Sequence, residues 1–182
     1  MVSQFISPHK VGLLGDLKFS FPEGTHAVGR LDNMSEGLLI LTTNKKITKL
    51  LFAGQVPHKR TYLVQVRKEI SQENLLHLRS GVSITIAGGF KYITPPCEAV
   101  LVDNPENFIR NIGINDRIGP HSWILITLTE GKYHQVRKMV AAVKHRCRRL
   151  VRVAIEDLKL GTLEPGGVTE IEESTIFTLL NL

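Results

Sequence analysis

Hydrophobic and polar residues alternate in several short stretches of the chain, and this pattern predicts β-strands. Residues 37–43 are almost all apolar and predict a buried strand, whereas residues 61–67 place Tyr62, Val64 and Val66 on one face. Further strands are predicted at residues 82–86, 98–102, 123–129, 150–155 and 176–180. Their spacing is irregular, and no internal repeat accompanies it.

Three other stretches have the periodicity of helices. Asn44 is placed to cap a helix over residues 45–53, and Ser71 is placed to cap a second helix that closes at Gly81. A third helix is predicted over about residues 135–145, where one face carries Val136, Met139, Val140 and Val143. Residues 103–121 predict a long loop. Strands and helices in this irregular order predict an α+β fold around a mixed or antiparallel sheet.

The composition changes this picture little. The chain has 182 residues, 42% of them hydrophobic and 22% charged, and we expect one globular domain over residues 1–182. No apolar run approaches the length of a membrane span, and the first residues lack the pattern of a secretory signal. Cys97 and Cys147 fit no metal-ligand spacing, so we expect reduced thiols, no bound metal and a cytoplasmic protein.

The charge is distributed unevenly. Lysine and arginine number 23 against 17 acidic residues, a net charge of +6. Residues 132–152 hold eight basic side chains and no acidic one: Lys132, Arg137, Lys138, Lys144, Arg146, Arg148, Arg149 and Arg152. This basic segment accounts for more than the whole net charge. It favours a polyanionic partner such as nucleic acid, although a solvated helix face is the alternative.

A polar cluster lies directly before the first apolar run, in the stretch HAVGRLDNMSEGLLILTT at residues 26–43. It contains Arg30, Asp32, Asn33, Ser35 and Glu36. A turn in which Asp32 caps its own backbone is the simpler interpretation, and an active-site loop at the end of a sheet is the other. The two carboxylates also allow a glycosidase-like acid and nucleophile pair.

Arg137 is predicted in the first turn of its helix, where the helix dipole does not favour a cation. Its position therefore indicates a partner, either a phosphate or a carboxylate, and Asp32 is the natural candidate. Tyr62 is equally well explained as a half-buried aromatic residue of a strand. His134 and Gln135 are equally well explained as polar residues at a helix start. Taken singly, none of these residues establishes a site.

Together the segments resemble a known family. GRLDNMSEGLLILTTN (29–44), KRTYLVQV (59–66) and EGKYHQVRKM (130–139), in this order, resemble the signature segments of pseudouridine synthases of the RsuA type. LVRVAIEDLKLGTLEPGG (150–167) is similar to that family's closing segment. The resemblance implies the pseudouridine synthase fold, an α+β fold whose mixed, largely antiparallel sheet is bisected by an RNA-binding cleft. It is greatest to the RluE-like subgroup that acts on large-subunit ribosomal RNA and lacks an S4 domain.

The resemblance also implies roles. Asp32 matches the catalytic aspartate, Tyr62 the tyrosine that stacks on the target base, and Arg137 the basic residue that pairs with the aspartate. The reaction would isomerise one uridine of ribosomal RNA, in the large-subunit 23S molecule, to pseudouridine by base flipping, without a cofactor or metal. The RNA-binding residues would be Arg30, Lys132, His134, Gln135, Lys138, Arg149 and Arg152.

Several features depart from this family or leave alternatives open. The chain starts where the family's first strand should end, so we expect that strand to be truncated. Lys144 stands where a glycine is usual after the helix. A monomer is expected. A non-catalytic RNA-binding or ribosome-assembly protein that keeps the fold is one alternative, and a glycosidase or nucleoside hydrolase that uses Asp32 and Glu36 is another.

Overall fold

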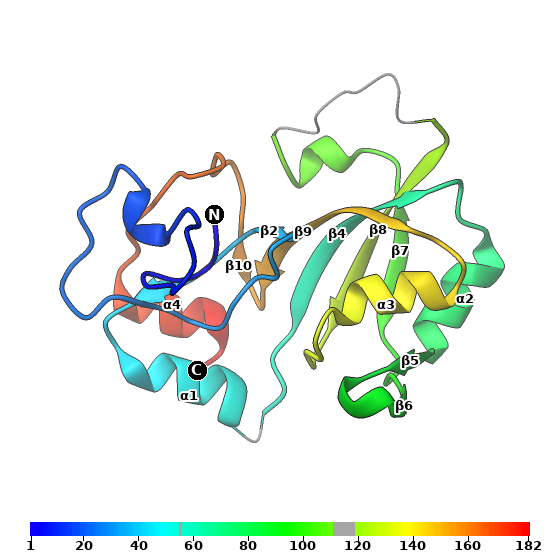
Figure 1. Cartoon of the computed structure of the whole chain (residues 1–182), viewed down its shortest axis with the longest axis horizontal. Helices are drawn as coiled ribbons and strands as arrows, with labels where there is room; N and C mark the ends of the chain where they lie inside the picture. The colour runs from blue at the N-terminus through cyan, green and yellow to red at the C-terminus, as the bar shows by residue number, and fades with distance from the viewer. Residues whose placement is uncertain (55, 111–118) are drawn as a thin grey trace.

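The computed structural model describes residues 1–54, 56–110 and 119–182. Its main sheet has the strand order β10-β9-β4-β8-β7, with β2 paired to the side of β9 (Figure 1). These strands are β2 (Glu36–Gly37), β4 (Arg60–Arg67), β7 (Glu98–Val102), β8 (His121–Leu128), β9 (Cys147–Ile155) and β10 (Leu158–Lys159). All pairs are antiparallel except β2 with β9, which is parallel. The predicted α+β class and mixed, largely antiparallel sheet are confirmed.

Two smaller sheets and four helices complete the described structure. The small sheets pair β1 (His26–Ala27) with β3 (Leu41–Thr42), and β5 (Ser83–Thr85) with β6 (Lys91–Ile93). The helices are α1 (Lys45–Ala53), α2 (Gln72–Ser80), α3 (Gln135–Ala142) and α4 (Glu173–Leu180). Short 3₁₀ turns occur at Leu14–Asp16, Ala87–Gly89 and Pro105–Asn107. None of the helices in the described part of the chain combines the length and the hydrophobicity that a membrane span requires.

The long strands β4 and β9 run between two halves of the molecule (Figure 1). One half holds α1, α4 and both chain termini, and the other holds α2, α3 and the β5–β6 hairpin. Alternate residues of β4 face opposite sides of the sheet: Val64 and Val66 pack against α2 and α3, whereas Leu63 packs with Trp123 and Val151. The sheet therefore has a buried core on each face.

The predicted helix caps are present. The Asn44 side chain accepts a hydrogen bond from the Lys46 backbone N–H at 2.9 Å, and Ser71 Oγ accepts one from Asn74 N–H at 3.2 Å. Each cap satisfies a backbone donor that the first helical turn leaves free. The helix predicted over residues 135–145 ends earlier, at Ala142, and Lys144 then takes a left-handed φ of 64°. Lys144 thus occupies a conformation that glycine adopts more readily.

The strand predicted over residues 37–43 is divided between two sheets. Gly37 belongs to β2 on β9, whereas Leu41 and Thr42 form β3 on β1. The pattern of apolar residues is correct, since Leu38 and Ile40 are both buried. The change of partner follows from tertiary pairing, which hydrophobic alternation does not encode.

The strand predicted over residues 176–180 is wrong, because this segment is part of α4. Its β-branched and aromatic residues favour a strand locally. In the structure, however, Ile176, Phe177 and Leu180 pack against the core around α1 and β10, which a helical arrangement allows. Within the loop predicted over residues 103–121, residues 111–118 lie outside the described part of the chain, and β8 begins at His121.

The contact between Gly37 and β9 is too close for any other residue. Gly37 has φ +104°, and an added Cβ would lie 2.4 Å from the Arg152 carbonyl oxygen and 2.7 Å from its nitrogen. We expect Gly37→Ala to lower the free energy of unfolding by about 3 kcal/mol, because it combines backbone strain with a main-chain clash. Chemical denaturation followed by circular dichroism measures this loss.

Gly24→Ala is the matched control. Gly24 also has a positive φ, +80°, but nothing lies within 4 Å of its added Cβ. It should show only the left-handed strain, about 1 kcal/mol. Equal losses in the two variants would contradict the proposed close contact between Gly37 and β9.

Candidate active site

Asp32 lies in the loop between β1 and β2, and its side chain is free of its own turn. The turn is closed by the Asp32 backbone carbonyl, which accepts a hydrogen bond from Ser35 N–H at 2.8 Å. The carboxylate faces α3 instead, with Oδ1 3.7 Å from His134 Nε2 and the Asp32 side chain 31% exposed. In the described residues the side chain accepts no hydrogen bond from its own loop, since Ser35 N–H is bonded to the backbone carbonyl. The loop is therefore a turn, as the simpler interpretation predicts, but its backbone closes it and the Asp32 side chain does not.

The start of α3 is held by a network of polar side chains. Gln135 Oε1 accepts a hydrogen bond from Lys132 N–H at 2.7 Å, and Gln135 Nε2 donates to Glu130 at 2.6 Å. The Tyr92 hydroxyl donates to the other oxygen of Glu130 at 2.5 Å, and this hydrogen bond raises the pKa of Tyr92. His134, which precedes the helix, has a left-handed φ of 54°. The network thus holds His134 in a strained conformation that directs it toward Asp32.

Arg137 reaches the same loop but does not pair with Asp32. Its guanidinium donates hydrogen bonds to the Met34 carbonyl and, at 3.5 Å, to Cys147 Sγ. Among the described residues it forms no ion pair with Asp32, so the predicted salt bridge is absent in this conformation. The physical reason is that Asp32 is turned toward His134, which leaves a backbone carbonyl as the acceptor for Arg137. The Asp32 loop and the start of α3 do meet, as predicted, but Arg137 contacts the Met34 carbonyl there and the Asp32 carboxylate faces His134.

Tyr62 lies on β4 between Ile126 of β8 and Arg152 of β9. The register of β4 with β9 shifts between Thr61 and Tyr62, as a β-bulge does. Tyr62 is half-buried and packs at the edge of the core beneath α3. Its side chain therefore lies on the same face of the sheet as α3.

Arg152 is buried beside Tyr62. Only 3% of Arg152 is exposed, and its Nε donates a hydrogen bond to the Leu38 carbonyl at 2.8 Å. Burial lowers the pKa of Arg152, and the neighbouring Tyr62 side chain partly opposes this shift. Its Nη2 is buried without a hydrogen-bond partner among the described residues. Arg152 therefore connects β9 to the segment after the Asp32 loop, and the prediction that it contacts RNA at the surface does not fit its burial.

The other predicted RNA-binding residues differ in exposure. Gln135 is 4% exposed and holds the turn before α3, so it too differs from the expected RNA-facing residue. Arg149 forms two hydrogen bonds with Glu36, at 2.6 and 3.0 Å. Arg30 and Lys132 are exposed, and Lys138 is half-buried. The basic segment is therefore not one continuous surface, because alternate residues of β9 face opposite sides of the sheet.

The bond between Glu36 and Arg149 also bears on the glycosidase alternative. Both carboxylate oxygens of Glu36 are engaged by the Arg149 guanidinium. A carboxylate that acts as acid or nucleophile must present an oxygen to the sugar, and here both oxygens of Glu36 are already bonded to Arg149. The geometry thus does not support Asp32 and Glu36 as an acid and nucleophile pair.

Two exposed hydrophobic side chains beside Asp32 were not predicted. Met34 is 76% exposed in the Asp32 loop, and Tyr133 is 71% exposed before α3. The Tyr133 ring is stacked on His134, with centroids 3.9 Å apart and an interplanar angle of 18°. The sequence signal for them was a large apolar residue within a polar segment, Met34 in residues 30–36 and Tyr133 in residues 130–135.

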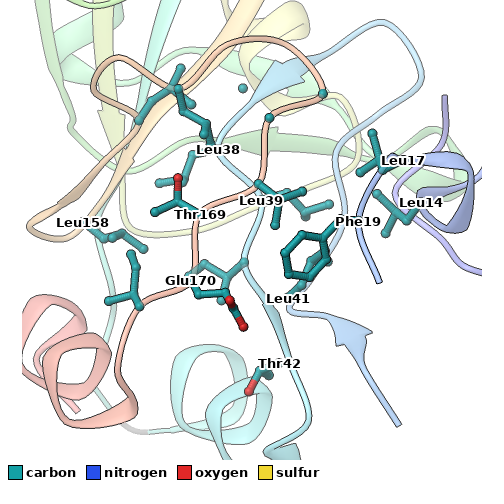
Figure 2. Close-up of a pocket in the computed structure, with 18 of the residues that line it drawn as sticks. Leu14, Leu17, Phe19, Leu38, Leu39, Leu41, Thr42, Leu158, Thr169 and Glu170 are labelled. Carbon is teal, nitrogen blue, oxygen red and sulfur yellow. The ribbon is translucent and has the colours of Figure 1, made fainter. Parts of the chain in front are cut away.

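A separate apolar cavity of about 630 Å³ lies between the N-terminal segment, the 36–44 segment and the chain after β10 (Figure 2). Its lining includes Leu14, Leu17, Phe19, Leu38, Leu39, Leu41, Leu158, Thr169 and Glu170. Asp32, Tyr62 and Arg137 do not line it. Among the described residues, no three His, Cys, Asp or Glu side chains are grouped to hold a metal ion. The polar residues around Asp32 therefore form the candidate active site, apart from this cavity.

Comparison with known proteins connects this site to a family. A family model described as RNA pseudouridylate synthase matches residues 16–142. The chain is 35% identical over 148 residues to the ribosomal large subunit pseudouridine synthase E of Vibrio parahaemolyticus, covering 81% of this chain and 60% of that relative. It is 37% identical over 150 residues to the protein of the same name from Xanthomonas axonopodis pv. citri, covering 81% of this chain and 76% of that relative.

The fold agrees with a solved structure. The chain matches one described as a crystal structure of pseudouridylate synthase with a TM-score of 0.71 and 26% identity, over 88% of this chain and 63% of that one. In the sequence comparison, the chain spans 60% of the length of the Vibrio relative. The family match includes the Asp32 loop and the start of α3, which form the candidate site, and also Tyr62 on β4. The chain belongs to the RNA pseudouridylate synthase family.

Proposed function

We propose that this chain converts a uridine of large-subunit ribosomal RNA to pseudouridine, with Asp32 as the catalytic carboxylate. The observation that carries the proposal is the position of Asp32. Its carboxylate is partly exposed and faces His134 across the junction between the loop and α3, within the segments that match the family. The names of the relatives from Vibrio and Xanthomonas support the ribosomal substrate.

The reaction is an isomerisation. It breaks the N1–C1′ bond of the uridine, turns the uracil and joins C5 to C1′, and the hydrogen on C5 is released to solvent while N1 gains one. We propose that the target base is flipped out of its stack to reach Asp32. We also propose that the chain acts as a monomer in the cytoplasm, with exposed Arg30 and Lys132 near the RNA backbone.

Asp32→Asn keeps the shape of the side chain and removes its charge. We expect this variant to fold normally and to lose pseudouridine formation by at least about 100-fold. Tritium release from ribosomal RNA labelled at uracil C5 measures the rate, followed by mapping of the modified uridine.

Asp103→Asn is the matched control, since Asp103 is exposed just after β7 and should be indifferent to the change. An Asp32→Asn protein that works at the wild-type rate would remove Asp32 from the mechanism. RNA binding by a wild-type protein that releases no tritium would favour the non-catalytic ribosome-assembly function instead.

Tyr62 is proposed to stack on the flipped uracil. Tyr62→Ala should weaken binding of the substrate RNA by about tenfold, because an aromatic ring contributes most of a base stack. Tyr62→Phe should keep RNA binding but lose about 1 kcal/mol of folding stability, because the hydroxyl beside buried Arg152 is removed. Fluorescence anisotropy and thermal unfolding measure the two effects. Identical RNA affinities for the Phe and Ala variants would argue against stacking.

Arg137 is proposed as a positioning residue that holds the Asp32 loop through the Met34 carbonyl. Lysine cannot reproduce the planar fork that also reaches Cys147. We therefore expect Arg137→Lys to lower kcat about tenfold or more with little change in KM, because Asp32 would be less well oriented.

Arg67→Lys is the control for this change, since Arg67 is exposed at the far end of β4. A rise in KM alone in Arg137→Lys would indicate that Arg137 binds RNA without orienting the loop.

A further inference from the structure

Tyr133 is a large aromatic side chain held at the surface beside the proposed catalytic carboxylate. It is 71% exposed, and its ring stacks on His134 at a centroid distance of 3.9 Å. His134 in turn lies 3.7 Å from Asp32. The His134 ring therefore lies between the Tyr133 ring and the Asp32 carboxylate.

The ring of Tyr133 is oriented without being buried. Its neighbour His134 is fixed in a left-handed conformation, and the hydrogen bonds of Gln135 close the turn on either side of the pair. The Lys138 ammonium lies 5.4 Å from the centre of the Tyr133 ring. A side chain that is ordered by its neighbours and still open to solvent loses little conformational entropy when it binds a partner.

The surroundings select the class of partner. The Lys138 ammonium lies over the Tyr133 ring, and Lys132 precedes Tyr133 in the chain with its own ammonium over the ring of Tyr92. No acidic residue occurs from residue 132 to residue 152. Exposed aromatic rings among basic side chains are typical of surfaces on which unpaired nucleobases stack. Met34 is also exposed and lies in the Asp32 loop, where its carbonyl accepts a hydrogen bond from Arg137 of α3. Two apolar side chains therefore accompany the Asp32 site, one from each of its two segments.

We propose that Tyr133 stacks on a nucleobase of the RNA next to the target uridine, and so favours a target in an unpaired or locally opened segment. The proposal rests on the proposed function, because it places the target uridine at Asp32. When the uridine leaves its stack, its neighbour loses a stacking partner, and the ring of Tyr133 offers a replacement. Lys138, on a flexible side chain, moves from the ring to a phosphate as the base arrives.

The first experiment measures stacking without requiring catalysis. Wild type, Tyr133→Leu and Tyr133→Phe are titrated with fluorescein-labelled oligouridylate and with an abasic ribose-phosphate chain of the same length. We expect Tyr133→Leu to bind oligouridylate about tenfold more weakly and the abasic chain unchanged, and Tyr133→Phe to match wild type on both.

Phe90→Leu is the matched control, because Phe90 is 70% exposed on the β5–β6 hairpin and lies outside the proposed site. It should leave both affinities unchanged. Equal losses of Tyr133→Leu on the two probes would show an effect through the backbone or the fold, and would overturn the proposal. No loss on either probe would also overturn it and would assign the ring to another partner, such as a protein.

The second experiment locates the base. On an RNA that carries the mapped uridine, single abasic riboses replace each neighbouring nucleotide in turn, and tritium release gives KM and kcat. Tyr133→Leu should raise KM about tenfold with kcat little changed. An abasic ribose at one position should raise the KM of the wild-type protein by the same factor, and it should leave the KM of Tyr133→Leu unchanged. If the effects of Tyr133→Leu and of the abasic ribose on KM add at every position, the proposal is overturned.

A wild-type protein that releases no tritium would contradict the proposed function. The oligouridylate comparison would still decide whether Tyr133 stacks on bases. The two failures are therefore distinguishable.

Discussion

The junction between the segment 36–38 and strand β9 determines where the candidate site lies. Gly37 packs directly on the backbone of Arg152, and the Leu38 N–H donates to the Arg152 carbonyl at 2.8 Å while Arg152 Nε returns a hydrogen bond to the Leu38 carbonyl. Glu36 adds a bidentate bond to Arg149. Because these contacts hold the end of the loop to the central sheet, Asp32 is carried to a defined place beside α3.

The opposite wall of the site depends on a short strained turn. His134 adopts a left-handed conformation that non-glycine residues rarely take. The partly buried network of Gln135, Glu130 and Tyr92 stabilises that turn through its hydrogen bonds. Strain of this kind persists where surrounding contacts determine the conformation. Here the turn brings His134 to Asp32, and the exposed Tyr133 ring is stacked on His134. The same hydrogen bonds therefore hold the turn in place and leave its side chains exposed.

The basic segment illustrates how one charge pattern serves several purposes. Arg152 is buried and holds the backbone of Leu38, Arg149 binds Glu36, and Arg137 binds the carbonyl of Met34. Three arginines of the segment therefore connect the Asp32 loop to β9 and α3. Exposed charge is supplied by other members, including Lys132, Lys144 and Arg146. Arg152 is costly to bury, since its Nη2 has no hydrogen-bond partner among the described residues, and the neighbouring Tyr62 side chain opposes part of the effect of burial on its pKa.

The sequence by itself determined the elements whose signals are local. Helix caps at Asn44 and Ser71, the apolar face of α3 and the alternation along β4 all follow from periodicity and backbone hydrogen bonding. The order of three signature segments, at residues 29–44, 59–66 and 130–139, indicated the family. Only the tertiary structure decided that residues 37–43 divide between two sheets and that residues 176–180 form a helix. It likewise decided that Asp32 faces His134 while Arg137 binds Met34. These outcomes depend on which distant segment supplies the partner, and neither residue spacing nor local propensity specifies a partner more than a hundred residues away.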